Sequence, residues 1–180
     1  EALRHLQGEG IINIVPNRGP MVCTLNMKDV FEIYSLRSVI EGLAIRLTAE
    51  WATDEEINQL ESIYHEMKNK LDDPSVVFLL EDSFRIHDMI MKLSNHTQLI
   101  SIYQSLSFKI SLINRLLGTK KTKQYEVDQH HELIEAVRKR DLEHAERVMR
   151  RHIYRSYNDY IELNKVSEKP DEYKEKLWYS

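Results

Sequence analysis

Apolar residues recur at intervals of three and four positions along most of the chain from residue 26 onward. This spacing places them on one face of an α-helix, the face that a soluble protein normally buries. The pattern breaks at residues that end or begin helices, such as Pro74, Gly118 and Asp141. It predicts six helices, over about 27–51, 54–71, 74–94, 97–117, 123–139 and 142–164. Because the connections are short, we expect an all-α fold in which about six helices form an antiparallel bundle.

The first 25 residues follow a different pattern. Residues 1–8 are typical of the end of a helix, with a glycine as its last residue. Two β-prone runs, 11–15 and 21–22, then flank the turn-rich residues 16–20, which predicts a β-hairpin. A helix end and one hairpin cannot form a stable domain alone, so we expect them to belong to a domain that starts upstream of this chain. The alternative is an ordinary N-terminal hairpin.

Three of the eight histidines lie on the apolar stripes of three different predicted helices. The stripes read Val77, Leu80, Phe84, His87 and Met91; Val127, His130, Ile134 and Val137; and Leu142, Ala145, Met149 and His152. A buried imidazole needs partners for its ring nitrogens, and a neutral imidazole is the commonest metal ligand. Three interpretations follow: a metal site, a metal-free polar pocket, or three unrelated core histidines.

The stripe of the first predicted bundle helix contains one charged residue, Arg37. A buried guanidinium must pair with an anion. Glu41, one turn further along the same helix, is the simplest partner. The second candidate is the carboxylate of a bound effector, because a guanidinium holds a carboxylate through two parallel hydrogen bonds.

Length, composition and charge limit the cellular compartment and the binding partners that we expect for this protein. A chain of 180 residues is long enough for one domain with its own core. It has no apolar run that could span a membrane and no signal-peptide pattern, so we expect a cytoplasmic protein without a membrane partner. The single cysteine, Cys23, excludes an intramolecular disulfide. The net charge of −4 argues against strong nucleic-acid binding through charge alone.

The run EALRHLQGEGIINIVPNRGPMV resembles the end of the winged helix-turn-helix of GntR-superfamily transcription regulators. The resemblance implies that residues 1–7 are the end of the recognition helix and that residues 11–22 are the wing. It implies DNA contacts for Arg4, Asn17, Arg18 and Gly19. DNA would then be bound through the complete module, most of which is absent from this chain.

Most of the remaining chain, from about residue 29 to 164, resembles the effector-binding FCD domain of the FadR subfamily of GntR regulators. The most specific match is the ordered set His130, Leu133, Ile134, Ala136, Asp141, Ala145, Met149 and His152. The implied domains are a winged helix-turn-helix remnant over 1–25, a helical effector-binding domain over 26–165 and a polar tail over 166–180.

Metal-binding members of that family use one Asp and three His. Carried across, the histidines are His87, His130 and His152, the same three that the apolar periodicity selects. The Asp should lie one turn before His87, where this chain has Ser83, a poor ligand for a divalent metal. Asp82 is the other candidate, but helix geometry places it about 140° around the helix from His87.

These observations predict a ligand-responsive transcription regulator rather than an enzyme. A small organic acid would bind a divalent metal, most simply Zn or Ni, together with Arg37 and the neighbouring His131, and would control how a homodimer binds DNA. One alternative is a metal-free effector-binding bundle. Another is a metal-dependent hydrolase, which needs a general base such as Glu81, Asp82 or Asp128 beside the metal.

Overall fold

The structure, a computed structural model, describes residues 1–8, 10–117, 123–163 and 178. Helices dominate this part of the chain, and one antiparallel hairpin near its start supplies the strands. The elements are α1 (Ala2–Gly8), β1 (Ile12–Val15), β2 (Gly19–Val22), α2 (Met27–Trp51), α3 (Asp54–Asn69), α4 (Val77–Leu93), α5 (Thr97–Leu117), α6 (Lys123–Arg138) and α7 (Leu142–Leu163). The predicted all-α bundle and its preceding hairpin are confirmed.

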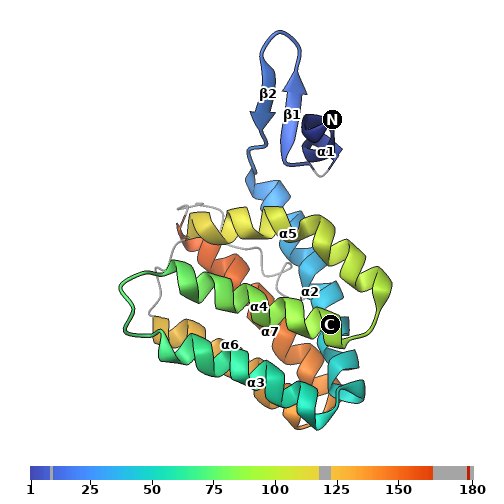
Figure 1. Ribbon diagram of the computed structural model, residues 1–180, viewed down its shortest axis with the longest axis vertical. Helices are drawn as coiled ribbons and strands as arrows, with labels where there is room; N and C mark the ends of the chain where they lie inside the picture. Colours follow the sequence, from blue (N-terminus) through green and yellow to red (C-terminus); the bar gives the residue numbers. More distant parts are fainter. Residues whose placement is uncertain (9, 118–122, 164–177, 179–180) are drawn as a thin grey trace.

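Helices α2 to α7 form the bundle (Figure 1), and α2 contacts the other helices more extensively than any other helix does. It contacts α7 most extensively and also contacts α4, α5 and α6, while α3 lies against α4 and α6. Apolar side chains from all six helices form one core, to which α2 contributes Val30, Ile33, Ala44 and Ile45. A helix buried along so much of its circumference can hold polar side chains only where they find partners inside the bundle.

Local capping explains where several helices start. Asn26 and Asp29 form a capping box at the start of α2, and Thr53 and Glu56 form the predicted one at the start of α3. The Asp141 carboxylate accepts the His144 backbone N–H at 3.0 Å, as expected of an N-cap at the start of α7. These short-range interactions are the reason that the periodicity located these helix starts well.

Helix α4 starts later than the sequence predicts. Its first residue is Val77 rather than Pro74, because the Asp73 carboxylate accepts the Ser75 backbone N–H at 2.7 Å and forms a turn there. The first part of its predicted buried stripe is also wrong: Val77 is 49% exposed, and Leu80 and Phe84 are only partly buried. The periodicity correctly placed these residues on one face of α4. The N-terminal end of that face, however, borders a cavity instead of the core.

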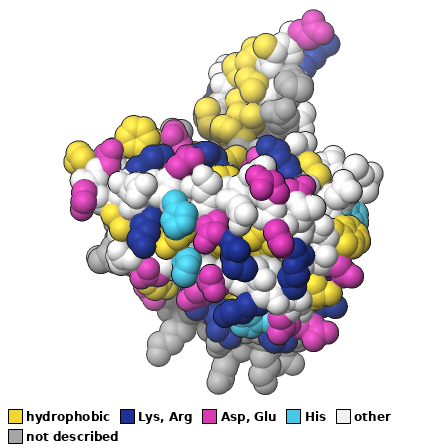
Figure 2. Space-filling model, turned by 60° about the horizontal axis from the view of Figure 1, so that its bottom comes forward, with side chains coloured by type: hydrophobic (Ala, Val, Ile, Leu, Met, Phe, Trp, Pro, Cys, Tyr) yellow, Lys and Arg dark blue, Asp and Glu magenta, His cyan; other side chains and the backbone are white. Residues whose placement is uncertain are grey.

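The N-terminal elements stand apart from the bundle, with the hairpin projecting beyond it (Figure 1). Strand β1 pairs with β2 in a register that places Ile12 opposite Val22, and α1 packs against β1. The turn between the strands needs left-handed backbone at Asn17 (φ 63°) and Gly19 (φ 78°), which asparagine and glycine tolerate best. Figure 2 shows apolar side chains gathered on this projecting part, in contrast to the interspersed charges over the bundle.

The predicted polar tail, 166–180, lies outside the described residues except for Trp178. This side chain is buried and stacks on Tyr157, with ring centroids 5.3 Å apart, and meets Phe31 edge-on. Within the described ranges, no helix combines the length and the apolar character that crossing a membrane would require.

Candidate metal and effector site

The structure brings together the three histidines of the apolar stripes. His87 comes from α4, His130 from α6 and His152 from α7, and their exposed fractions are 4, 1 and 4%. One potential ligand atom from each lies within 4.8 Å of the other two. The ring centroids of His130 and His152 are 4.7 Å apart, and those of His87 and His152 are 5.0 Å apart. The cluster lies in the interior of the bundle, where α4, α6 and α7 approach α2.

A buried ion pair on α2 orients His87. The Arg37 Nε–H donates to one oxygen of Glu41 at 2.6 Å, and His87 Nδ1 lies 2.5 Å from the other oxygen. An ionised carboxylate can only accept, so Nδ1 of His87 must carry the proton. The Nε2 of His87 faces the cluster and lies 3.1 Å from the Nε2 of His152. Glu41 thus fixes which nitrogen of His87 faces the cluster.

His130 is oriented in the same way by the backbone. Its Nδ1–H donates to the carbonyl oxygen of Glu126 at 2.7 Å, one turn earlier on α6. The Ser83 hydroxyl lies 2.9 Å from His130 Nε2 and donates to it when the imidazole is neutral. Ser83, at the position where the family resemblance implies Asp, therefore does face the cluster.

The third histidine is the least satisfied. Nδ1 of His152 is buried and has no hydrogen-bond partner among the described residues. Its Nε2 faces the lone pair of His87 Nε2 at 3.1 Å, a contact that is stable only with a proton or a cation between the two nitrogens. Two ligands on a tetrahedral ion with bonds of about 2.05 Å lie about 3.3 Å apart, so this pair fits a metal such as zinc.

Protonation states favour metal binding. Burial and the nearby His87 lower the pKa of His130 to about 3. Burial together with His130 and His87 holds the pKa of His152 well below its ordinary value. Burial alone would raise the pKa of Glu41, but Arg37 and His87 outweigh it and lower this pKa to about 2. At neutral pH the site therefore offers the neutral imidazoles of His130 and His152 and an anionic carboxylate.

The remaining candidates lie elsewhere. Asp82 is buried, but its oxygens accept from Lys70 at 2.6 Å and Arg85 at 2.8 Å, so it faces α3 rather than the histidines. His131 is 47% exposed at its side chain and stacks on Tyr64, with ring centroids 4.9 Å apart. Asp128 is exposed and accepts from a neighbouring glutamine. Among the described residues, neither Asp82 nor Asp128 joins the three-histidine group, so these two general-base candidates of a hydrolase lie away from it.

Sequence reasoning missed the link from Glu41 to His87. It identified Glu41 only as a local partner for Arg37, and the structure shows that pair with a cation–π contact from Arg37 to the Tyr34 ring at 5.0 Å. In the structure Glu41 is 1% exposed, which the sequence alone does not show. A carboxylate buried that deeply needs more than one partner, which is a reason to look for a second cationic or N–H donor.

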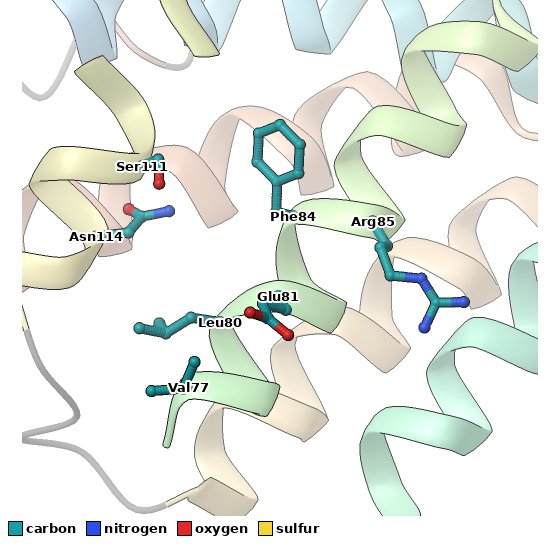
Figure 3. A pocket seen from close by; sticks show the side chains of 7 residues that line it. All are labelled: Val77, Leu80, Glu81, Phe84, Arg85, Ser111 and Asn114. Carbon is teal, nitrogen blue, oxygen red and sulfur yellow. The ribbon is translucent and has the colours of Figure 1, made fainter. Parts of the chain in front are cut away.

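A cavity of about 430 Å³ lies between the first turns of α4 and the second half of α5 (Figure 3). Its lining side chains are Val77, Leu80, Glu81, Phe84, Arg85, Ser111 and Asn114. In Figure 3, Ser111 and Asn114 point from α5 toward α4, while the Arg85 guanidinium turns toward α3, where it contacts Glu66 at 2.7 Å. Most of the cavity surface is apolar. Its lining residues on α4 include Glu81 and Phe84, which lie within two positions of Ser83 in the sequence.

The residues implied at DNA lie on the projecting N-terminal elements. Arg4 is exposed on α1, and Asn17 and Arg18 are exposed at the hairpin turn, followed by the partly buried Gly19. All four residues lie within the first 19 positions of the chain, on α1 and the hairpin. The histidine cluster lies in the helical bundle. One connection between the cluster and these residues is α2, the helix that follows the hairpin.

Comparison with known proteins gives the family. Residues 32–155 match the family model of the FCD domain. The Nta operon transcriptional regulator of Aminobacter aminovorans is 28% identical over 163 residues, covering 91% of this chain and 76% of the relative. The transcriptional repressor RspR of Escherichia coli strain K12 is 26% identical over 159 residues, covering 85% of this chain and 68% of the relative.

Solved structures agree on the fold. Escherichia coli McbR/YncC superposes with a TM-score of 0.81 at 15% identity, covering 90% of this chain and 82% of that one. The metal-free FCD domain of TM0439 gives a TM-score of 0.67 at 18% identity, covering 80% of this chain and 99% of that one. These identities are low, so the two structures support the fold and nothing finer.

The fold and the family match define a class of helical regulatory domain. The chain belongs to the FCD domain family and is a transcription regulator of the GntR type, not an enzyme. The resemblance drawn from its sequence is confirmed, and the comparisons give the hydrolase alternative no support.

Proposed function

We propose that the helical domain binds a divalent metal through His87, His130 and His152, takes up a small organic acid there, and thereby controls DNA binding by a homodimer. The observation that supports this proposal is the convergence of three buried imidazoles from three helices within 4.8 Å. Neutral nitrogen ligands favour Zn or Ni. When bound, such an ion would supply an electrophilic centre for an oxygen of the effector.

The residues around the histidines support metal binding more than a core role. Glu41 and the Glu126 carbonyl both accept from Nδ1 atoms, which leaves the Nε2 atoms of His87 and His130 as lone pairs inside the cluster. Such outer hydrogen bonds are typical of metal-bound histidines, because they fix the ring and the tautomer. Unrelated core histidines would have no reason to share this arrangement.

In this proposal Arg37 has two functions. Its Nε–H holds Glu41, and its terminal N–H groups would bind the effector carboxylate, since a guanidinium has five donors in a fixed plane. His131 is a weaker candidate contact, because it is exposed and stacked on Tyr64. The apolar part of the effector would occupy the cavity between α4 and α5, whose apolar lining includes Val77 and Phe84.

The connection to DNA follows from the position of α2. Arg37 and Glu41 lie on α2, and α2 follows the hairpin that carries Asn17 and Arg18. A ligand that binds one position of α2 better than another shifts the population of the two positions, and the DNA-binding elements move with it.

Metal analysis and thermal unfolding test the metal. We expect about one Zn or Ni per chain and a higher melting temperature after metal is added, because binding only to the folded state stabilises it. His152→Ala should lose both effects, and His131→Ala, one residue from the cluster on an exposed face, should keep them. A wild-type chain whose melting temperature ignores both metals would contradict the metal site.

A second experiment separates the metal-dependent from the metal-free version of effector binding. A panel of organic acids is titrated against the zinc-loaded chain and against the chain kept in chelator, with the melting temperature as the readout. We expect stabilisation only with zinc, and its loss in Arg37→Lys, which keeps the charge but not the planar pair of donors. Equal stabilisation in chelator would instead favour the metal-free effector-binding bundle.

A further inference from the structure

An aromatic cluster lies between the start of α2 and the second half of α7, and a residue near the end of the chain completes it. The rings are Phe31 on α2, Tyr154 and Tyr157 on α7, and Trp178. Trp178 stacks on Tyr157 with ring centroids 5.3 Å apart, and its centroid lies 5.5 Å from that of Tyr154. The Phe31 ring meets the indole edge-on at 6.2 Å. Since Trp178 is 1% exposed, its indole is part of the core.

One further ring connects this cluster to the proposed effector site. Tyr157 also lies against Tyr34, with ring centroids 6.1 Å apart. The Tyr34 hydroxyl donates to the side-chain oxygen of Asn114 at 3.2 Å, and Asn114 lines the cavity between α4 and α5. The Arg37 guanidinium lies over the Tyr34 ring, 5.0 Å from its centroid. Contacts therefore run without interruption from Trp178 to the side chain that is proposed to bind the effector carboxylate.

The Tyr34 ring matters because a guanidinium binds a carboxylate in only a few orientations. The Nε–H of Arg37 donates to Glu41 at 2.6 Å, which fixes one edge of the guanidinium. The ring of Tyr34 beneath the guanidinium limits how far the group can tilt about that edge. Two parallel hydrogen bonds to a carboxylate form only when the guanidinium plane points at the ligand. The position of Tyr34 therefore sets the direction in which Arg37 can bind.

We propose that Trp178 is a positioning residue of the effector site: its indole fixes Tyr157, and through it Tyr34, so that Arg37 is held in the orientation that binds a carboxylate. The inference rests on the effector site proposed above and adds to it a residue near the end of the chain. A site that is held in its binding geometry in advance loses less conformational freedom when the ligand binds, so it binds more tightly. Because coupling between two sites is reciprocal, a bound effector should also hold Trp178 more firmly.

The family match does not account for the contacts of Trp178. The FCD family model matches residues 32–155, and Phe31, Tyr157 and Trp178 all lie outside this range. The indole Nε1–H of Trp178 is buried and has no hydrogen-bond partner among the described residues. The cluster therefore uses the ring of Trp178 and not its N–H group, which makes phenylalanine the conservative replacement.

Tryptophan fluorescence tests the coupling without an effector. The chain has two tryptophans, so Trp51→Phe leaves Trp178 alone, and we expect a blue-shifted emission that acrylamide quenches poorly. Arg37→Lys in this background removes the planar group over Tyr34 but keeps the charge, and should make Trp178 easier to quench. Asp82→Asn, at a buried carboxylate outside the chain of rings, is the matched control and should change nothing.

Two results of this measurement would overturn the proposal. One is a red-shifted emission of Trp178 in the Trp51→Phe chain, and the other is equal quenching with and without Arg37→Lys. The measurement keeps Trp178 in place, so it does not depend on whether Trp178→Ala folds.

Titration of organic acids into the zinc-loaded chain tests the effect on binding. Trp178→Ala should weaken binding of the acids roughly tenfold, and Trp178→Phe should retain most of the affinity. Zinc content should not change, because His87 and His130 are oriented by Glu41 and the Glu126 carbonyl. The control is Trp51→Ala, which removes an exposed indole from α2 and should bind as the wild type does.

The outcomes separate this inference from the proposed function. Acids that bind the wild type and Trp178→Ala equally would overturn the positioning role and leave the effector site standing. A zinc-loaded wild-type chain that responds to no acid would contradict the effector site itself, and with it the role of Trp178.

Discussion

Glu41 and Asp82 are both carboxylates with 1% exposure, yet the structure uses them for different purposes. Glu41 pairs with Arg37 and His87, whose side chains are both 4% exposed. Asp82 pairs with Lys70 and Arg85, whose side chains are 34 and 45% exposed. The first carboxylate therefore supports the interior site, and the second joins α3 to α4 near the surface.

The difference shows that burial alone does not make a carboxylate part of the site. Asp82 lies five residues before His87 on α4, which turns it toward α3, as the helix geometry predicts. Glu41 lies on another helix and reaches His87 because α2 packs against α4. The function of a buried carboxylate is therefore shown by the residues that it pairs with, and not by how deeply it is buried.

The largest effect is expected from Glu41→Ala. It leaves the Arg37 guanidinium buried beside no anion and removes the acceptor that holds His87. We expect a loss of about 3–5 kcal/mol in the free energy of unfolding and of about 10- to 100-fold in metal affinity. Urea denaturation and a zinc titration measure the two effects.

The matched variant Glu41→Gln separates the charge from the hydrogen bonds. Glutamine keeps an oxygen acceptor for one of the two donors, so both losses should be smaller than in Glu41→Ala. Metal affinity that is unchanged in Glu41→Ala would show that Glu41 stabilises only the fold.

Ser83→Asp is expected to act in opposite directions with and without metal. It places an anion where the Ser83 hydroxyl now lies 2.9 Å from His130 Nε2. Without metal, the partly buried carboxylate should lower the free energy of unfolding by about 1–3 kcal/mol. With metal it becomes a fourth ligand, and zinc affinity should rise roughly tenfold or more. Ser83→Asn, similar in size but neutral, should not raise the affinity.

The sequence predicted those parts of the molecule that depend on short-range patterns. Capping at Thr53 and Asp141 and the apolar periodicity were sufficient for the helices, and the periodicity selected three histidines that meet. The contact of Glu41 with His87 joins residues 46 positions apart, so it depends on how α2 docks on α4. The exposure of Val77 was unpredictable for a similar reason: a helical pattern shows a face but not what covers it.

Asp82→Asn should have a smaller effect than either change at Glu41. Its partners, Lys70 and Arg85, are partly exposed and can turn to water when the charge is lost. We expect a loss of about 1–2 kcal/mol in the free energy of unfolding, measured in urea, with metal affinity unchanged. A fall in zinc affinity comparable to that of Glu41→Ala would mean that Asp82 reaches the histidines after all.

The smallest effect is expected from His131→Ala, which contrasts two neighbouring histidines on α6. His130 is 1% exposed within the cluster, whereas the His131 side chain is 47% exposed and stacks on Tyr64. One step along a helix turns a side chain by about 100°, which is enough to exchange the interior for the surface. His131→Ala should change the free energy of unfolding by no more than about 0.5 kcal/mol and leave zinc affinity unchanged. Its remaining predicted role, contact with the effector, is then tested by titrating organic acids into the zinc-loaded variant. A weaker response with normal metal content would place His131 at the entrance of the effector site.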